Sequence, residues 1–343
     1  MKTNIEAIIL GIAAVIDYRI GDPREWWHPV QGMGWIISRL SKFTIITCQR
    51  KWQRRWCGII LGLGVILGSG TAGWIIVYLA KNIHSLLGIV VQSILLASCF
   101  AARSLSFAAK AVLSSLVKGN IVIARSQLSQ YVGRDTDNLS EEEILRAVLE
   151  TVSENAIDGV TSPLFYAIVG AFFPEIGVVP LALGYKAVST LDSMIGYQED
   201  PFKDLGWFSA KLEDYLTWLP CRLTVLTLAL ISGKPLTVLS ICCRDASHDP
   251  SPNSGWSECI YAAILGVQLG GTNTYQSQLK YKPLLGDCLH PITPTIIYQA
   301  LQLTRICFLL WLVLGMVGLF CLAKYYLNSA ASPHFHIVSF LLT

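Results

Sequence analysis

Three long stretches without acidic or basic side chains constrain this chain more than any other feature. Residues 57–80 contain no charged residue, residues 83–102 contain only His84 as an ionisable group, and residues 306–323 are again uncharged. About 20 helical residues cross the ~30 Å hydrocarbon core of a bilayer. We therefore expect each stretch to form a membrane-spanning helix. A shorter apolar segment at 5–16 is either a first span or a helix tucked against the others.

The composition agrees with a membrane protein. Of the 343 residues, 53% are hydrophobic and 14% are charged, whereas soluble proteins carry about 25% charged residues. Residues 27–134 contain twelve Lys and Arg and no Asp or Glu. A nucleic-acid-binding protein would gather such charge on one exposed face. Here long uncharged runs interrupt it, so we expect a lipid bilayer and no nucleic acid as partner.

The basic residues also predict which side of the membrane each segment occupies. The segment 49–55, QRKWQRR, holds four cations just before the second apolar stretch, which favours the cytoplasmic side. The chain then leaves and returns through two spans, so 103–159 is expected to be cytoplasmic. This segment reads as helices, because Ser140 and Glu143 have the spacing of a capping box.

Two further apolar segments, 160–184 and 216–232, contain residues that a straight span disfavours. We expect both to be broken, re-entrant or folded into a hairpin around a cavity enclosed by protein. The predicted fold is therefore all-α: one polytopic membrane domain over 1–343 with broken segments and cytoplasmic helical loops. The interrupting residues are Pro163, Pro174, Glu175 and Pro180 in the first segment and Pro220 and Arg222 in the second.

Four polar stretches between the apolar segments are candidates for chemistry. In the first, DYRIGDPREWWHPVQGMG (17–34), Asp17, Asp22 and His28 belong either to a juxtamembrane loop with tryptophan anchors or to a substrate or metal site. In the second, SENAIDGVTSP (153–163), Glu154 and Asp158 follow Glu150 at four-residue spacing and share a helix face. That face is either solvated or holds Mg²⁺ beside a phosphate.

The third and fourth stretches combine cations with hydroxyl and carboxylate groups. In GYKAVSTLDSMIGY (184–197), Lys186 either extends to the membrane interface or neutralises a phosphate, and Asp192 lies in the same apolar helix. RDASHDPSPNSG (244–255) is typical of a turn before a helix. Because helix N-termini bind anions, Arg244 and His248 just upstream give it a second interpretation as an anion site.

The blocks GDP…HPVQGMG, SENAIDGVTSPLFY, GYKAVSTLDSMIGY, RDASHDPSPNSG and GVQLGG occur in this order. Together they resemble the CbiB/CobD family of cobalamin-biosynthesis membrane proteins, the adenosylcobinamide-phosphate synthases, over roughly residues 5–271. The resemblance implies an acid–amine ligase in the cell membrane with its site facing the cytoplasm. The implied reaction joins a propionate of (adenosyl)cobyric acid to 1-amino-2-propanol or its phosphate, with ATP and Mg²⁺. Association with other late-pathway corrinoid enzymes is a further expectation.

This reaction requires activation of a carboxylate, neutralisation of phosphate charge and a base for the amine. The residue types suggest roles for each of these tasks. The hypotheses are Glu154, Asp158 and Asp192 as Mg²⁺ ligands, with Asp192 also catalytic; Lys186, Arg244, Asn253 and Ser254 as phosphate contacts; His248 or Asp245 as the base; and Asp22 and His28 as contacts to the amine substrate or the corrinoid.

Two other classes remain as alternatives. A transporter would also have broken apolar segments with charges at membrane depth, but we find no internal repeat, and the polar groups gather in loops. A membrane-bound regulator of related architecture would be expected to lack the set Lys186, Asp192 and His248, all of which are present. The enzyme is therefore the preferred interpretation.

Overall fold

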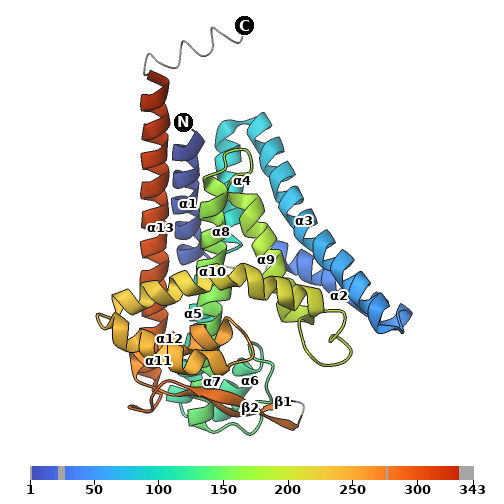
Figure 1. The fold of residues 1–343 in the computed structure, drawn as a ribbon, viewed down its shortest axis with the longest axis vertical. Coiled ribbons are helices and arrows are strands. Elements are labelled where there is room, and N and C mark those ends of the chain that lie inside the picture. The colour runs from blue at the N-terminus through green and yellow to red at the C-terminus, as the bar shows by residue number, and fades with distance from the viewer. Residues whose placement is uncertain (1, 22–27, 276, 332–343) are drawn as a thin grey trace.

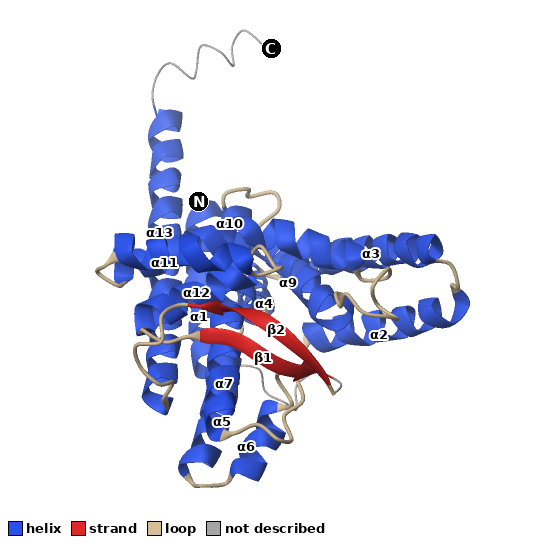
Figure 2. Ribbon diagram, turned by 60° about the horizontal axis from the view of Figure 1, so that its bottom comes forward, coloured by secondary structure: helices blue, strands red, loops and turns tan. Residues whose placement is uncertain are grey.

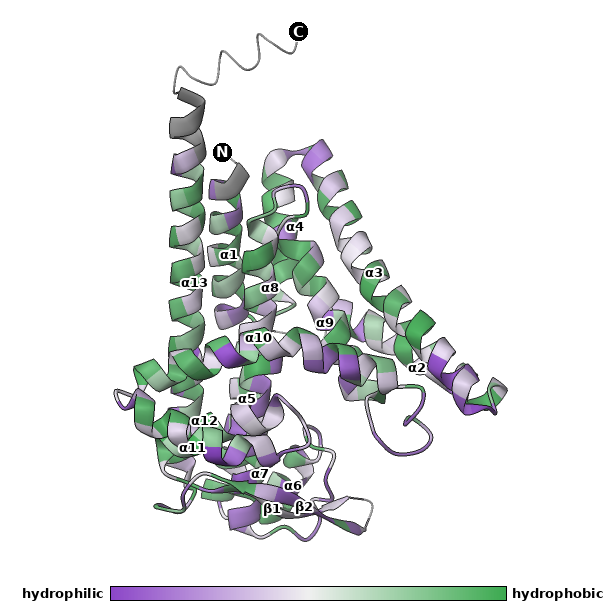
Figure 3. Cartoon of the chain, viewed as in Figure 1, coloured by the Kyte–Doolittle hydropathy of each residue, from purple (hydrophilic) through white to green (hydrophobic). Residues whose placement is uncertain are grey.

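A computed structural model describes residues 2–21, 28–275 and 277–331 of the chain. Its upper part consists of upright apolar helices, and its lower part gathers shorter helices and one β-hairpin (Figure 1). Hydrophilic residues concentrate in the lower part and at the helix ends (Figure 3). The chain is thus an all-helical membrane protein apart from a two-stranded sheet, which the sequence did not predict.

Four helical stretches of the described chain are long and apolar enough to cross a bilayer: Lys51–Ile83, Ser85–Val117, Trp207–Ile231 and Pro294–Tyr325. The first is α3 (Lys51–Ile83) and the last lies within α13 (Pro294–Ala331). Large apolar side chains on both are exposed, for example Leu67 at 65% and Leu314 at 60%. Such exposure is unfavourable in water and suits contact with lipid.

The second stretch bends between α4 (Ser85–Ala97) and α5 (Ala102–Val117). Its lower half, α5, leaves the upright bundle and packs on α6 (Ile121–Leu128) and α7 (Glu141–Ala156). The upright bundle also contains α1 (Lys2–Arg19), which packs against α13. Helix α2 (Pro29–Thr47) packs on α3 and on α9 (Val178–Ile195). The helix predicted at 5–16 therefore lies within the longer α1.

The segment predicted to be broken over 160–184 forms a helical hairpin. A π-helical turn, η1 (Ile157–Thr161), leads into α8 (Ser162–Ala171), and α9 returns alongside it. The turn needs glycine, because Gly177 has φ of 81° and a Cβ on Gly170 would lie 2.4 Å from the Gly177 carbonyl oxygen. The hairpin places α9 next to the end of α7.

The segment 216–232 was predicted to be broken, but it belongs to an unbroken helix. Helix α10 (Trp207–Ile231) is continuous with Pro220 inside it, and it runs crosswise over the lower part of the upright helices (Figure 1). A proline normally interrupts a helix because it lacks a backbone N–H. Here a tyrosine hydroxyl from α8 supplies the missing hydrogen bond, so the helix continues.

The lower part surrounds the end of α7. The predicted capping box at Ser140 and Glu143 is confirmed, with both reciprocal hydrogen bonds present. Helix α11 (Pro235–Asp245), the short turn η2 (Ala246–His248) and α12 (Ser254–Leu265) lie beside an antiparallel pair, β1 (Leu269–Tyr275) and β2 (Gln278–Leu285). Figure 2 shows this hairpin in red, running past α12 and α7.

Candidate functional site

Four carboxylates from four elements lie close enough to act electrostatically on one another. We call Glu154, Asp158, Asp192 and Glu213 the carboxylate cluster. Asp158 is within electrostatic range of the other three and of one cation, Lys186. Three of the four were predicted as Mg²⁺ ligands, and the structure brings them together. Glu213, from α10, was not predicted.

The local fold explains this convergence. Glu154 lies in the last turn of α7, and the wider π-helical turn that follows carries Asp158. Single π-helical turns are rare in proteins, and those that do occur are often found at functional sites. The α8–α9 hairpin then returns Lys186 and Asp192 to the same region, and α10 adds Glu213.

The cluster carries more negative charge than its neighbours neutralise. Burial raises the pKa of Asp158 well above its usual range, and the nearby carboxylates raise it further, although Lys186 opposes them. Burial and the charge of Glu154 raise the pKa of Asp192 to about 6. Such a site gains stability from protons or from a bound cation.

The donor chemistry suits Mg²⁺. Carboxylate oxygens are the hard ligands that this ion prefers. Across the described residues, however, no three His, Cys, Asp or Glu side chains are arranged to hold a metal ion by themselves. Mg²⁺ is commonly held by one or two carboxylates together with substrate phosphates. The cluster therefore fits an ion that arrives with a phosphate better than a closed protein cage.

A second group of charged residues, which we call the ion-pair network, ties α7 to the β-hairpin. Its members are Arg134, Arg146, Glu150, Glu258 and Lys282. Glu150 is 2% exposed, forms a close ion pair with Arg134 and lies 3.7 Å from Arg146. It also accepts a hydrogen bond from the backbone N–H of Gly270 at 3.0 Å. These bonds fix the hairpin over the end of α7.

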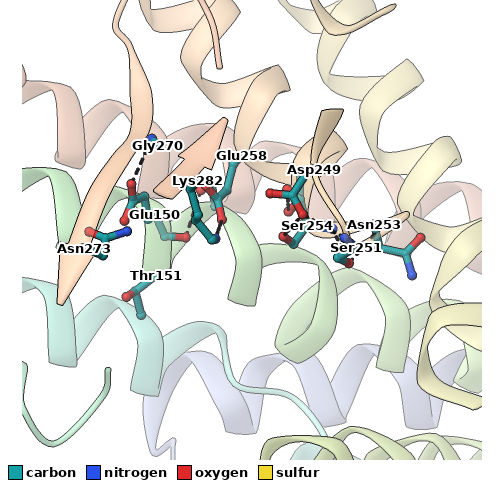
Figure 4. A network of polar contacts seen from close by, with 12 residues as sticks. Glu150, Thr151, Asp249, Ser251, Asn253, Ser254, Glu258, Gly270, Asn273 and Lys282 are labelled. Atoms are coloured by element: carbon teal, nitrogen blue, oxygen red, sulfur yellow. Dashed lines mark hydrogen bonds and ion pairs between the residues drawn. The ribbon is translucent and has the colours of Figure 1, made fainter. Parts of the chain in front are cut away.

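Glu258 and Lys282 form the other half of the ion-pair network. Their side chains are 2.9 Å apart, and Glu258 has no solvent exposure. Burial raises the pKa of Glu258 to about 8, while the surrounding carboxylates raise the pKa of Lys282. In Figure 4 Lys282 lies beside Glu258, with Glu150 close by. The second carboxylate oxygen of Glu258 has no hydrogen-bond partner in the structure.

A small polar cavity connects the two groups. It has a volume of about 130 Å³ and its walls include Glu150, Glu154, Glu258 and Lys282. Glu154 thus belongs to the carboxylate cluster and also faces this cavity. An adjoining apolar cavity of about 200 Å³ between α5, α6 and α7 shares Thr151 and other lining residues with it. A ligand with charged and apolar parts would find both environments here.

In the stretch 244–255, Arg244 and Asp245 form hydrogen bonds that hold the chain together beside this site. Arg244 Nε donates to Asp245 Oδ1 at 2.6 Å, and the backbone N–H of Gly286 donates to Asp245 Oδ2 at 2.9 Å. The Arg244 guanidinium holds the pKa of Asp245 below its usual range. A carboxylate that is already bonded on both oxygens and is this acidic is a weak base, so its geometry favours a structural role over the predicted catalytic one.

The helix start predicted at 253–255 is confirmed, but two of the three backbone N–H groups of these residues are already engaged. The Ser251 hydroxyl accepts hydrogen bonds from the backbone N–H groups of Asn253 and Ser254, at 3.3 and 3.1 Å. Asn253 donates its side-chain N–H to the backbone oxygen of Asp214 at 2.9 Å. The stretch is therefore anchored to α10 next to Glu213, and Ser251 takes a place that an anion would occupy.

The predicted histidines have different surroundings, and Asp22 lies outside the described residues. His248 is exposed, and its Nδ1 lies 3.2 Å from the backbone oxygen of Asp245. His28 is the N-cap of α2, where its Nδ1 accepts a hydrogen bond from the N–H of Val30 at 3.3 Å. This bond gives His28 a capping role, so of these two predicted histidines it is His248 that has an exposed side chain.

Sequence reasoning missed Glu213, Glu258 and Lys282. Glu258 is the one acidic residue in an otherwise apolar helix. Such an acid indicates an ion pair or a functional role, because buried charges are costly unless they are paired or used. Lys282 lies on a strand that the sequence did not predict. Glu150 was placed on the correct helix face, but no role followed from that placement.

Comparisons with known proteins find matches over most of the chain. The model of a family described as CobD/Cbib protein matches residues 10–304. A cobalamin biosynthesis protein CobD of Synechocystis sp. is 55% identical over 91% of this chain and 91% of its own. CobD of Halalkalibacterium halodurans is 42% identical over 80% and 84%. CbiB of Salmonella typhimurium is 37% identical over 85% and 91%. No solved structure matches the chain significantly.

Proposed function

The chain belongs to the CobD/CbiB family of cobalamin biosynthesis proteins, and we propose that it is the ligase that forms the aminopropanol amide of the corrinoid. The reaction would join a propionate of (adenosyl)cobyric acid to 1-amino-2-propanol or its O-phosphate, giving (adenosyl)cobinamide or its phosphate. The observation that carries the proposal is the carboxylate cluster with Lys186 beside it. That arrangement suits a phosphate-bound Mg²⁺.

The site residues would divide the work as follows. ATP with Mg²⁺ would supply the phosphoryl group that activates the carboxylate. One or two carboxylates among Glu154, Asp158 and Asp192 would hold the ion together with the phosphates. Lys186 would offset phosphate charge, a task for which an ammonium group is suited. Arg244 is a weaker candidate, because its guanidinium is already paired with Asp245 and with Asp287. Asn253 and Ser254 would position the wall of the site rather than bind phosphate.

The amine must lose a proton before it attacks, so a base is needed. His248 remains the candidate, because its imidazole is exposed and histidine is the side chain that most often serves as a general base in enzymes. The apolar cavity between α5 and α7 supports a place for part of the corrinoid. Asp22 and His28 stay proposals as contacts for the amine substrate or the corrinoid.

The proposed orientation places this site at the cytoplasmic face, where ATP is available. The four cations of 49–55 and the lower position of the site in Figure 1 support it. Association with other enzymes that handle late corrinoid intermediates would fit the same face. Such an association would keep a large substrate close to the membrane.

The decisive experiment is a product assay. Purified protein in detergent is incubated with cobyric acid, aminopropanol phosphate and Mg-ATP, and the corrinoid amide is measured by mass spectrometry. An active synthase of the family serves as positive control, and omission of ATP or of Mg²⁺ tests each requirement separately. Absence of the amide, under conditions where the control enzyme produces it, would refute the proposed activity.

A further inference from the structure

A large basic cavity lies at the lower ends of α1 and α13, where both meet α5. It has a volume of about 900 Å³. Its walls carry four cations, Arg19, Arg103, Lys110 and Arg305, from three different helices. The carboxylate on its wall is that of Asp17, which is 3% exposed. The cavity is thus basic, whereas the carboxylate cluster is acidic.

Two of the guanidinium groups are held in place around one tyrosine. Arg103 Nη1 donates to the backbone oxygen of Tyr18 at 2.7 Å. The guanidinium of Arg305 lies over the Tyr18 ring, 4.4 Å from its centroid. Guanidinium groups fixed in this way lose little entropy when they bind an anion, and their planar N–H donors match phosphate oxygens.

The position of the cavity indicates the depth at which its ligand lies. Arg103 and Lys110 belong to the candidate span Ser85–Val117, and Arg305 to the candidate span Pro294–Tyr325. Tyr18 and Tyr298, which also line the cavity, are exposed. Tyrosines and cations at the end of a span are typical of the headgroup region of a bilayer. Basic pockets between membrane helices at this depth bind anionic headgroups.

From the four cations, the prearranged guanidinium groups and this depth, we propose that the cavity is a binding site for a phosphate-bearing anion, distinct from the carboxylate cluster. The phosphate comes either from an anionic phospholipid or from a soluble phosphate compound. Arg103 and Arg305 contact the phosphate oxygens, and Arg19 and Lys110 add charge at the rim. The proposal does not depend on the ligase activity, because it concerns binding at residues outside that site.

The test compares two probes on the purified full-length protein. Phosphatidylglycerol in mixed micelles, against phosphatidylcholine as the neutral lipid, tests the lipid source, and sodium pyrophosphate tests the soluble source. The cavity variant combines Lys110→Gln with Arg305→Gln. The matched control combines Lys118→Gln with Lys324→Gln. It removes the same number of charges, at the end of α5 and on α13, from two residues that do not line the cavity. Bound probe is measured by native mass spectrometry and by the shift in Tm.

We expect one probe to bind the native protein and the control variant equally, and to bind the cavity variant about tenfold or more weakly. The affected probe identifies the source of the phosphate. If the double variant does not fold, Arg305→Gln alone decides, because that side chain is exposed and is one of the two proposed to contact the phosphate. The proposal is overturned if neither probe binds, or if the cavity and control variants lose equal affinity, since the effect would then be one of bulk charge.

Discussion

The hydroxyl of Tyr166 donates a hydrogen bond to the backbone oxygen of Leu216 at 2.8 Å. Leu216 is four residues before Pro220, so this oxygen is the one that the proline leaves without its helical N–H partner. The tyrosine, which comes from α8, therefore repairs α10 at its weakest turn. It also joins the helix that carries Glu213 to the hairpin that carries Asp192.

This repair predicts a coupling between Tyr166 and Pro220. Tyr166→Phe should lower the free energy of unfolding by about 1–3 kcal/mol, because the Leu216 oxygen loses its donor. In a Pro220→Ala background the restored backbone N–H should make the same change less costly. Unfolding in detergent of the two single variants and the double variant measures the coupling. Tyr215→Phe, on an exposed side chain of α10, is the control, and equal costs in both backgrounds would contradict the prediction.

Asp192→Asn should abolish amide formation while leaving expression and membrane insertion intact. The change removes one charge from the carboxylate cluster with little change in shape, so it should weaken cation binding rather than the fold. Product formation and the Mg²⁺ concentration for half-maximal rate measure the effect. Asp137→Asn, on an exposed loop residue, is the control. Near-normal activity in the Asp192 variant would remove this residue from the site.

The free energy of unfolding should fall as pH rises from the ordinary pKa of Glu258 to its pKa in the folded protein. Its pKa is raised from an ordinary value of 4.5 to about 8 in the folded chain. The folded state thus holds a proton that the unfolded chain releases, and this contribution to stability, complete below about 4.5, is lost as pH rises through about 8. Tm measured across this range should fall less steeply in Glu258→Gln than in Glu142→Gln. Identical slopes would exclude Glu258 as the source.

Substitutions of His248 and of Asp245 should differ in their effects on stability and on activity. His248→Ala should change stability by only about 0.5 kcal/mol, because the side chain is exposed, but should lower the amide-forming rate by about 100-fold or more if it is the base. Asp245→Ala should instead lower stability by about 1–3 kcal/mol, because the N–H of Gly286 loses its acceptor. Tm and turnover, measured on both variants, give the comparison. A stable but inactive Asp245 variant would reverse the two roles.

Positions 193 and 247 should be labelled from the same side of the membrane. Both residues are exposed serines, one beside Asp192 and the other beside His248. Single cysteines at these positions, in a background without the exposed native cysteines, are treated in sealed vesicles with an impermeant maleimide. A cysteine at position 51, in the basic segment, marks the cytoplasmic side. Labelling from opposite sides would refute a single site.

Several features of this protein follow from the sequence alone, because they depend on local patterns. Uncharged runs of bilayer length predict membrane helices, and α3 and α13 contain two of them. The spacing of Ser140 and Glu143 defines a capping box through contacts within one turn. The four-residue spacing of Glu154 and Asp158 indicates a shared face. The order of the motif blocks indicates the family, which the comparisons confirm.

Other features were decided by contacts between residues far apart in the chain. The sequence shows that Pro220 should break a helix, but only the tertiary structure supplies the Tyr166 hydroxyl that prevents the break. Glu213 and Lys282 join the site because α10 packs against the π-helical turn η1 and a short hairpin packs against α7 and α12. The carboxylate of Asp245 could serve as a base by its chemistry, yet Arg244 donates to its Oδ1 and Gly286 donates to its Oδ2. Local patterns fix which groups a helix displays, whereas packing determines which partners those groups meet and how costly their charge becomes.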